Sequence, residues 1–214
     1  MSRKLGRPSR ISRDAVLDAG VDVAMADPAG AVSIGAIARH LRVTPMAIYT
    51  YFSSKDELMQ ALSQRLLEGL DVTPSTAANP AERIRAWAYG IQRHFVANPA
   101  LMQMLTWEGG HNSVAWLDRS ACLISALEEL GLKDEVLAKA ILWIWGTVLG
   151  AVQFEIYDRQ TPSRMNAQEL AELSEVVRPG VGKVDAFLQD DNRYQNLFDF
   201  QMDRMMDGLM GLAA

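Results

Sequence analysis

Apolar residues recur every three or four positions along almost the whole chain, and no stretch shows the strict alternation that a half-buried strand requires. Clusters of proline, glycine and small polar residues interrupt this pattern at intervals that suit helices of about 8 to 25 residues. These clusters fall at 27–30, 71–80, 109–110, 131, 162 and 179–180. The pattern predicts an all-α protein.

Helix-capping residues divide the N-terminal third of the chain into four short helices. The expected caps are Ser12, Ser33, Thr44 and Ser54. Pro45 stands at the first position of the third helix, where its missing N–H costs nothing, and Glu57 follows Ser54 at the spacing of a capping box. Further helices are expected at about 81–97, 99–107, 113–130, 134–158, 167–177 and 192–212.

The second and third helices, separated by a tight turn at Arg42-Val43, have the lengths and spacing of a helix-turn-helix. Ala38 supplies a small residue midway along the second helix, where the third helix must approach closely. The apolar residues between the two helices are expected to be Ile34, Ile37, Leu41, Val43 and Ile48. The residues left to face outward are Thr44, Met46, Ala47, Thr50 and Tyr51. This arrangement favours insertion of the third helix into the major groove of DNA.

The distribution of charge separates this N-terminal part from the rest of the chain. The net charge is −5, but residues 1–55 hold eight Lys/Arg against four Asp, while the remainder holds 13 basic against 22 acidic residues. The first thirteen residues carry five cations and no anion. A basic end on an acidic body indicates that the N-terminal end meets a polyanion.

Residues 32–62, with the sequence VSIGAIARHLRVTPMAIYTYFSSKDELMQAL, resemble the helix-turn-helix of the TetR/AcrR family of transcriptional regulators. The positions that carry the resemblance are Ile37, Ala38, Val43, Thr44, Tyr49, Phe52, Lys55 and Leu58. Arg42 departs from the family, which usually has glycine in this turn; a left-handed residue other than glycine costs about 1 kcal/mol. The resemblance implies a helix-turn-helix DNA-binding domain at 1–55, with a basic N-terminal arm, and a ligand-binding and dimerisation domain at 56–214.

The resemblance also implies which side chains meet DNA. Base edges would be contacted by Thr44, Met46, Ala47, Thr50 and Tyr51, and Pro45 occupies a family contact position without an N–H to donate. Phosphates would be contacted by Ser33, Arg42, Tyr49 and Lys55. Two alternatives stay open: Tyr49 is either a phosphate contact or a core aromatic, and the arm either contacts DNA or is a solubilising tail. Phe52 is expected to pack under the fourth helix.

Two C-terminal helices, 134–158 and 192–212, hold more apolar surface than a monomer covers, and they resemble the family's four-helix dimer interface. Gly146 and Gly150, four residues apart, would let another backbone approach. The expected apolar face of the last helix consists of Leu197, Phe198, Met202, Met205, Met206, Leu209 and Met210. The alternative is a core formed within one chain.

A pocket for a small hydrophobic or aromatic effector is implied by the same resemblance. Its candidate residues are Trp87, Ile91, His94, Phe95, Trp107, His111, Trp116, Trp143, Thr147 and Phe154, with Gln92, Gln153 and Glu155 as further polar groups. Ordinary core packing is the alternative for each aromatic side chain. The expected function is that of a repressor that binds a palindromic operator as a homodimer and is released by the effector; the alternative is an adaptor protein that keeps the fold without operator binding.

Several other classes are excluded by the residue types. Three histidines and one cysteine form no zinc-binding pattern, and the glycine loops of nucleotide-binding enzymes are missing, so we expect no enzyme, metal or cofactor. The longest charge-free apolar run, residues 140–154, has 15 positions, whereas a membrane span takes roughly 20. A single cysteine and the lack of an apolar leader favour a cytoplasmic protein without membrane contact.

Overall fold

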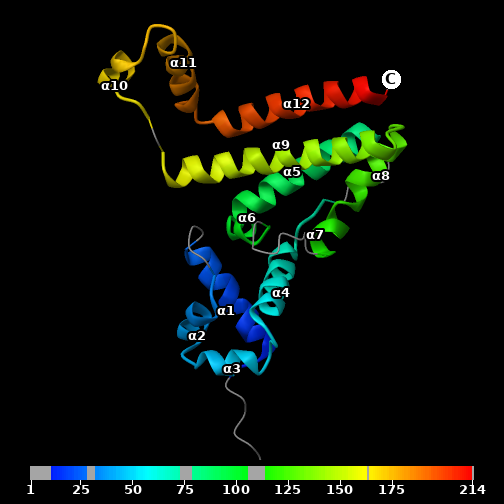
Figure 1. Ribbon diagram of the computed structural model, residues 1–214, viewed down its shortest axis with the longest axis vertical. Helices are drawn as coiled ribbons and strands as arrows, with labels where there is room; N and C mark the ends of the chain where they lie inside the picture. The colour runs from blue at the N-terminus through cyan, green and yellow to red at the C-terminus, as the bar shows by residue number, and fades with distance from the viewer. Residues whose placement is uncertain (1–10, 28–31, 73–78, 106–113, 163, 214) are drawn as a thin grey trace, which may run out of the picture. The chain divides into compact units, whose positions relative to one another are not determined.

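The computed structural model describes residues 11–27, 32–72, 79–105, 114–162 and 164–213, and all regular structure within these ranges is helical (Figure 1). The all-α prediction is therefore confirmed. The chain forms two compact units, one made of Met1–Val72 with Arg93–Ala121 and the other of Thr73–Gln92 with Cys122–Ala214. One helix, α5 (Pro80–Ala97), contributes residues to both units.

The first unit contains the N-terminal helices α1 (Arg13–Ala26), α2 (Ile34–Leu41), α3 (Pro45–Tyr49) and α4 (Lys55–Leu67), together with α6 (Ala100–Leu105) and α7 (Val114–Arg119). α1 packs against α2 and α4, and α2 packs against α3. Gly20 allows the close approach of α1 to α4, because a Cβ atom at this position would lie 2.4 Å from Cδ2 of Leu62. The fully buried side chains of this core include Val16, Ile37, Ile48, Phe52, Leu58 and Leu62.

Local hydrogen bonds explain where these helices begin. The side chains of three predicted caps, Ser12, Ser33 and Ser54, each accept a hydrogen bond from a backbone N–H in the first turn. Thr44 stands at the cap position of α3, but its side chain accepts no such bond. The predicted capping box of α4 forms in altered form, since the Glu57 carboxylate accepts from the N–H of Ser53, 2.7 Å away.

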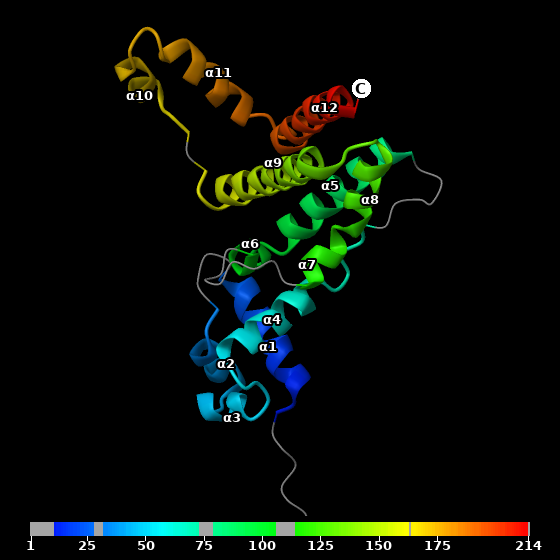
Figure 2. The ribbon, with the colours of Figure 1, turned by 45° about the vertical axis from the view of Figure 1, so that its right-hand side comes forward.

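The second unit contains the start of α5 and five further helices: α8 (Ala121–Glu129, from Cys122), α9 (Asp134–Gln160), α10 (Ala167–Glu172), α11 (Arg178–Leu188) and α12 (Arg193–Ala213). α12 runs alongside α9 in both views, and α10 packs against α11 (Figures 1 and 2). Apolar side chains from the two long helices fill the core of this unit: Ile144, Val148, Val152, Phe198, Met202, Met205 and Leu209.

Three helix predictions were wrong. The helix expected at 113–130 is divided at Ser120, whose hydroxyl donates to the carbonyl oxygen of Trp116, a local bond that competes with a continuing helix. The helix expected at 167–177 ends at Glu172. α11 was missed because Pro179-Gly180 was interpreted as a break, whereas Pro179 lies in the first turn of α11, where a helix needs no N–H from it.

By length and composition, α9 is also long and apolar enough to cross a membrane, which the short charge-free run did not suggest. The charge-free run is shorter than the apolar part of α9 because one or two charged residues do not prevent a helix from spanning a membrane. Only 22% of the most apolar window of α9 is buried.

Candidate nucleic-acid interface and effector site

One side of α3 faces the core and the other faces solvent. Ile48 is fully buried, whereas Met46 is 74% exposed. Thr44, Pro45 and Thr50 are exposed as well, and Ala47 is half-buried. The exposed side therefore presents two hydroxyl groups and several apolar groups, which are suited to base edges and to thymine methyl groups in a major groove.

The turn between α2 and α3 is left-handed at Arg42, with φ 56° and ψ 44°. The Arg42 N–H donates to the carbonyl oxygens of Ala38 and Arg39, and the Val43 N–H donates to that of Ala38 at 3.0 Å. These bonds close the end of α2 and offset the cost of a left-handed arginine. The departure from glycine thus leaves the turn intact and places an exposed cation beside α3.

The predicted phosphate contacts lie at helix starts and at the end of α3. Ser33 caps α2, with its hydroxyl oxygen 3.2 Å from the Ala36 N–H. Lys55 is the first residue of α4 and is exposed. Tyr49 is 45% exposed, so it is not a core aromatic. Phe52 is 1% exposed, as expected for a residue under α4.

Tyr51 does not present its hydroxyl to solvent as a free group. The hydroxyl donates to the carbonyl oxygen of Ile11 at 2.6 Å, and Arg13 donates in return to the Tyr51 carbonyl oxygen at 2.8 Å. The same Arg13 nitrogen lies 2.9 Å from Glu57, and the guanidinium lies 4.2 Å from the centre of the Phe52 ring. We call Ile11, Arg13, Tyr51 and Glu57 the arm clasp. Sequence patterns placed Glu57 in a capping box but missed its pairing with Arg13, because the two residues lie 44 positions apart.

Neighbouring hydrogen-bond donors stabilise the ionised form of Glu57. The Ser53 N–H, and then Arg13, lower the pKa of Glu57 from 4.5 to about 2. Since the pKa is lower in the folded state, the stabilisation is complete above pH 4.5 and is lost as the pH falls towards 2. Thermal unfolding of Glu57→Gln should therefore depend less steeply on pH in this range than that of the wild type. An unchanged pH dependence would show that the ionised Glu57 does not stabilise the domain.

The predicted effector residues of the first unit have side chains that already pack in the core or form hydrogen bonds within the chain. Phe95 and Trp116 are buried, with ring centroids 5.7 Å apart in an edge-to-face arrangement. His94 Nε2 lies 2.7 Å from the Leu66 carbonyl oxygen, to which it donates, so this nitrogen binds the last turn of α4. Trp107 and His111 lie outside the described residues.

The remaining effector candidates belong to the second unit, and the structure does not bring them together at one place. Trp87 and Ile91 are fully buried on α5, whereas Trp143 is 42% exposed on α9. The Trp143 ring lies against α12, because a Cβ atom on Gly208 would come within 2.5 Å of it. Thr147 donates its hydroxyl to the Trp143 carbonyl oxygen at 2.8 Å. Trp143 and Thr147 therefore lie near the surface of the α9–α12 pair.

Phe154, by contrast, borders a small cavity between α5, α9 and α12, with a volume of about 10 Å³. Its polar wall contains Gln92, which donates to the buried carboxylate of Glu155 at 3.2 Å. The Gln201 side-chain oxygen is also buried at this place and has no hydrogen-bond partner in the described structure. This volume is far below the roughly 300–1,000 Å³ of pockets that hold drug-sized molecules.

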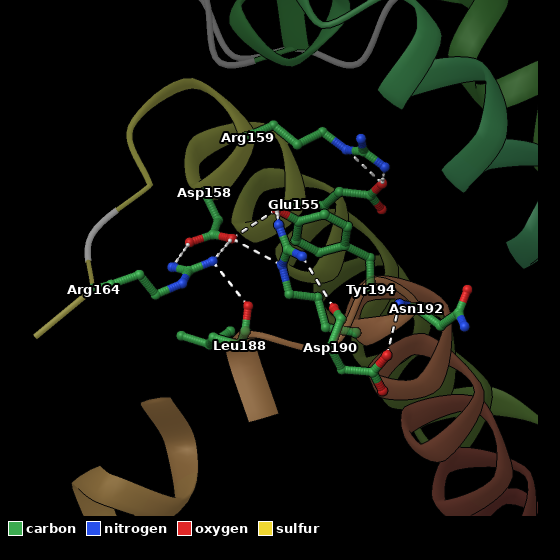
Figure 3. A network of polar contacts seen from close by, with 9 residues as sticks. Glu155, Asp158, Arg159, Arg164, Leu188, Asp190, Asn192 and Tyr194 are labelled. Carbon is green, nitrogen blue, oxygen red and sulfur yellow. Dashed lines mark hydrogen bonds and ion pairs between the residues drawn. The ribbon is translucent and has the colours of Figure 1, made fainter. Parts of the chain in front are cut away.

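A polar network joins the end of α9 to the start of α12 (Figure 3). The Asp158 side chain is 7% exposed, and its two oxygens accept from Arg164 at 2.8 and 3.0 Å. Tyr194 donates to the same carboxylate at 2.7 Å, and Arg193 lies 3.4 Å from it. Arg164 also donates to the Leu188 carbonyl oxygen, at the end of α11. Hydrogen bonds from Arg164 chiefly hold the pKa of Asp158 well below its usual range.

An exposed short helix on a helix-turn-helix, with cations beside it, is the arrangement of a DNA-binding protein. Comparison with known proteins supports this class. Residues 16–62 match the family described as "Bacterial regulatory proteins, tetR family". The chain is 25% identical to the HTH-type transcriptional repressor DrrR1 of Streptomyces coeruleorubidus over 229 aligned positions, which cover 97% of this chain and 82% of that protein.

Solved structures share the fold. A possible TetR family transcriptional regulator from Streptomyces coelicolor A3(2) superposes with a TM-score of 0.75 at 18% identity, over 94% of this chain and all of the other. The Streptomyces coelicolor TetR family protein ActR, in complex with (S)-DNPA, gives 0.69 at 18% identity, over 94% of this chain and 98% of that one. Residues 16–62 thus match a family of bacterial regulatory proteins, and the solved structures share the fold of the chain.

Proposed function

We propose that this protein is a repressor that binds a palindromic operator as a homodimer and releases it when a small hydrophobic or aromatic effector binds. The observation that carries the proposal is the exposed side of α3, held on the core by the buried Ile48. Repression is favoured by the 25% identity to DrrR1, which is named a transcriptional repressor. Like other regulators of the family, it would act in the cytoplasm.

In this proposal the exposed residues of α3 and its flanks contact base edges, while cations and helix starts contact phosphates. Thr44, Pro45, Met46, Ala47 and Thr50 would lie in the major groove. Ser33, Arg42, Tyr49 and Lys55 would lie against the backbone on either side of it. The two groups differ in their dependence on salt and on sequence, which makes them separable by experiment.

Lys55→Ala should weaken binding to all duplexes alike and reduce the slope of log affinity against log salt by about one, because one phosphate contact is lost. Thr50→Ala should instead change base preference and leave the slope unchanged. Fluorescence anisotropy over a salt series, with the gene's upstream DNA and with a scrambled duplex, separates these outcomes. Lys183→Ala, an exposed lysine on α11, is the matched control and should bind as the wild type does. A change of base preference in Lys55→Ala would contradict the proposed division.

The dimer is supported by apolar side chains that the chain itself leaves uncovered. On α9, Leu142 and Tyr157 are 65% and 60% exposed, and on α12 Phe200 is 61% exposed. Within the part of the chain that the structure describes, no neighbouring atom lies within 4 Å of a Cβ atom placed on Gly146 or Gly150, so this side of α9 has room for a second backbone. Five of the seven α12 residues expected at the interface are buried within the chain: Phe198, Met202, Met205, Met206 and Leu209. The interface would therefore use other positions of α12, including Phe200, Met210 and Leu212.

A second chain, rather than lipid, is the proposed cover of α9. The helix has glutamate, aspartate and lysine at its start and Asp158 in an ion-pair network at its end, and α12 lies along it. Regulators of this family act on DNA, and DNA binding does not require that α9 span a membrane.

ActR, which shares the fold, has been solved with the small molecule (S)-DNPA, and this favours a small-molecule effector for the present chain. The candidate residues named from the sequence stay predictions of its contacts. An effector would release DNA if it binds more tightly to a dimer whose two α3 helices are wrongly spaced for the operator. The coupling free energy between the effector site and the DNA site is typically 1–3 kcal/mol.

A gel shift with the DNA upstream of the protein's own gene, repeated with candidate apolar and aromatic effectors, tests the whole proposal. Binding that is competed by specific but not by scrambled duplex supports it, and loss of the shifted band with an effector supports the regulation. A dimer that binds no duplex even at low salt would favour the adaptor alternative.

A further inference from the structure

The residues 50–54 join the end of α3 to the start of α4, and the proposed DNA contacts lie on both sides of this junction. The base contacts belong to α3 and its flanks, whereas Lys55, a proposed phosphate contact, is the first residue of α4. α3 has only five residues, and a helix of this length does not hold its own conformation in water. Tertiary contacts must therefore fix α3 and the first turn of α4 relative to each other.

The arm clasp holds the end of α3 through α1. One nitrogen of the Arg13 guanidinium donates to the Tyr51 carbonyl oxygen at 2.8 Å and also to the Glu57 carboxylate at 2.9 Å. The guanidinium lies 4.2 Å from the centre of the buried Phe52 ring. The Tyr51 hydroxyl donates in turn to the Ile11 carbonyl oxygen at 2.6 Å. A single side chain of α1 thus contacts both the backbone after α3 and the first turn of α4.

Glu57 closes the junction from the side of α4. One of its carboxylate oxygens accepts from Arg13, and the other accepts from the Ser53 N–H at 2.7 Å and from the Ser53 hydroxyl at 2.8 Å. The Glu57 N–H donates to the Ser54 hydroxyl oxygen at 3.0 Å. Lys55 lies between these bonded residues, so the direction in which its side chain leaves α4 depends on the same turn.

A second ion pair between α1 and α4 provides a comparison. Arg65, near the end of α4, lies 2.7 Å from Asp18 on α1, and both ion pairs are partly exposed to solvent. The Arg13–Glu57 pair differs because Arg13 also binds the backbone that follows α3. If the two pairs merely stabilised the packing of α1 on α4, the loss of either one should have the same effect on DNA binding.

We propose that Arg13 and Glu57 are positioning residues for DNA binding, which hold Lys55 in place to contact phosphate while α3 contacts the bases. The proposal rests on the proposed function, since it concerns a DNA complex. It involves described residues alone, because the basic arm, residues 1–10, lies outside the described ranges. Neither Arg13 nor Glu57 needs to touch the DNA.

Charge alone predicts the opposite effect of removing the Glu57 carboxylate. Glu57→Gln takes away an anion two residues from Lys55 and leaves the Arg13 cation without this counter-ion, and both changes favour the approach of phosphates. Glutamine still offers an oxygen to the Ser53 N–H, but it forms no ion pair with Arg13. Weaker DNA binding by Glu57→Gln therefore reports a loss of position rather than a change of charge.

A double-mutant cycle with Lys55→Ala in the full-length protein tests the proposal. Fluorescence anisotropy with the DNA upstream of the protein's own gene, over a salt series, measures affinity and slope for the wild type, each variant and the combination. Glu57→Gln alone should weaken binding about 3- to 10-fold, as expected for one lost hydrogen bond, and should make the salt slope shallower by up to about one. In the Lys55→Ala background the same change should alter affinity by less than about two-fold, because the contact that it positions is already missing.

Asp18→Asn is the matched control, since it removes the carboxylate of the other ion pair between α1 and α4 and changes the net charge by the same amount. It should alter affinity by less than about two-fold. Glu57→Asp keeps the charge but shortens the side chain by one methylene group, and should weaken binding as Glu57→Gln does.

Tighter binding by Glu57→Gln, equal losses with and without Lys55, or an equal loss in Asp18→Asn would overturn the positioning role. Failure of the proposed function is distinct from this, because the wild type would then bind no duplex at all. Thermal unfolding of each variant identifies one that does not fold, and if that variant is Glu57→Gln, then Glu57→Asp carries the test.

Discussion

Asp158→Ala should destabilise the protein by about 3 kcal/mol, near the lower end of the range for breaking a buried ion pair. The carboxylate is 7% exposed and accepts from Arg164 and Tyr194, with Arg193 at its edge. Its removal takes away the ionic acceptor of the Arg164 guanidinium, which keeps the Leu188 carbonyl oxygen, and the acceptor of the Tyr194 hydroxyl. The two arginines are 25% and 20% exposed, so water partly replaces the lost partner and keeps the cost below the upper values. Urea unfolding of the full chain at neutral pH measures the difference.

Asp207→Ala is the control for this prediction. Asp207 forms an ion pair with Arg204 on α12 at 3.0 Å, but both side chains are about two-thirds exposed. Its removal should change the free energy of unfolding by less than about 1 kcal/mol. Equal losses in the two variants would show that the Asp158 network is no stronger than a surface ion pair.

The Asp158 contribution should also depend on pH. Its pKa lies below the ordinary value of 3.8 in the folded protein, chiefly because Arg164 donates to the ionised form. The stabilisation is therefore fully present above pH 3.8 and is lost as the pH falls below that value. The difference in stability between the wild type and Asp158→Ala should shrink on acidification, and a difference that grows would contradict the assignment.

Leu142→Glu should convert the proposed dimer to monomers and lower affinity for the proposed operator at least about 100-fold. Leu142 is 65% exposed on α9, on the surface proposed for the second chain. The substitution would bury a carboxylate from each subunit in an apolar interface without a partner, at a cost of several kcal/mol. A monomer holds one half-site alone and loses the gain in effective concentration from two linked binding events.

Sedimentation velocity measures the association, and anisotropy with the upstream DNA measures the affinity. Val176→Glu is the control, because Val176 is 91% exposed between α10 and α11 and should be neutral in both measurements. A Leu142→Glu variant that stays dimeric would place the interface elsewhere. A monomeric variant with undiminished affinity would instead contradict operator binding by a dimer.

The helix-turn-helix could be predicted in detail because the interactions that define it are local. Ser12, Ser33 and Ser54 cap their helices through bonds that span three residues, and the buried Ile37 and Ile48 follow from helical periodicity. The left-handed conformation of Arg42 was expected from the family resemblance, because the family usually has glycine at this turn. Pro179 shows the limit of this reasoning, because the same residue breaks a helix in its interior and begins one in its first turn.

The effector residues were harder to place, because an aromatic side chain on a helix has the same sequence pattern whether it lines a pocket, fills a core or faces another chain. Trp116 packs on Phe95, whereas Trp143 lies against Gly208 at the surface of the α9–α12 pair. His94 was expected to meet a ligand, yet its nitrogen donates to the end of α4. Only the positions of distant segments distinguish these outcomes.

The sequence by itself determined the helical class, the helix-turn-helix and its resemblance to the TetR/AcrR family, because periodicity, caps and a charged arm act within a few residues of one another. The tertiary structure alone decided what depends on residues far apart. In the folded chain the Tyr51 hydroxyl donates a hydrogen bond to the carbonyl oxygen of Ile11, forty positions away. Tyr194 likewise donates to the Asp158 carboxylate, 36 positions away. A hydrogen bond across such a separation leaves no periodic trace in the chain, since its geometry exists only after the intervening helices have packed.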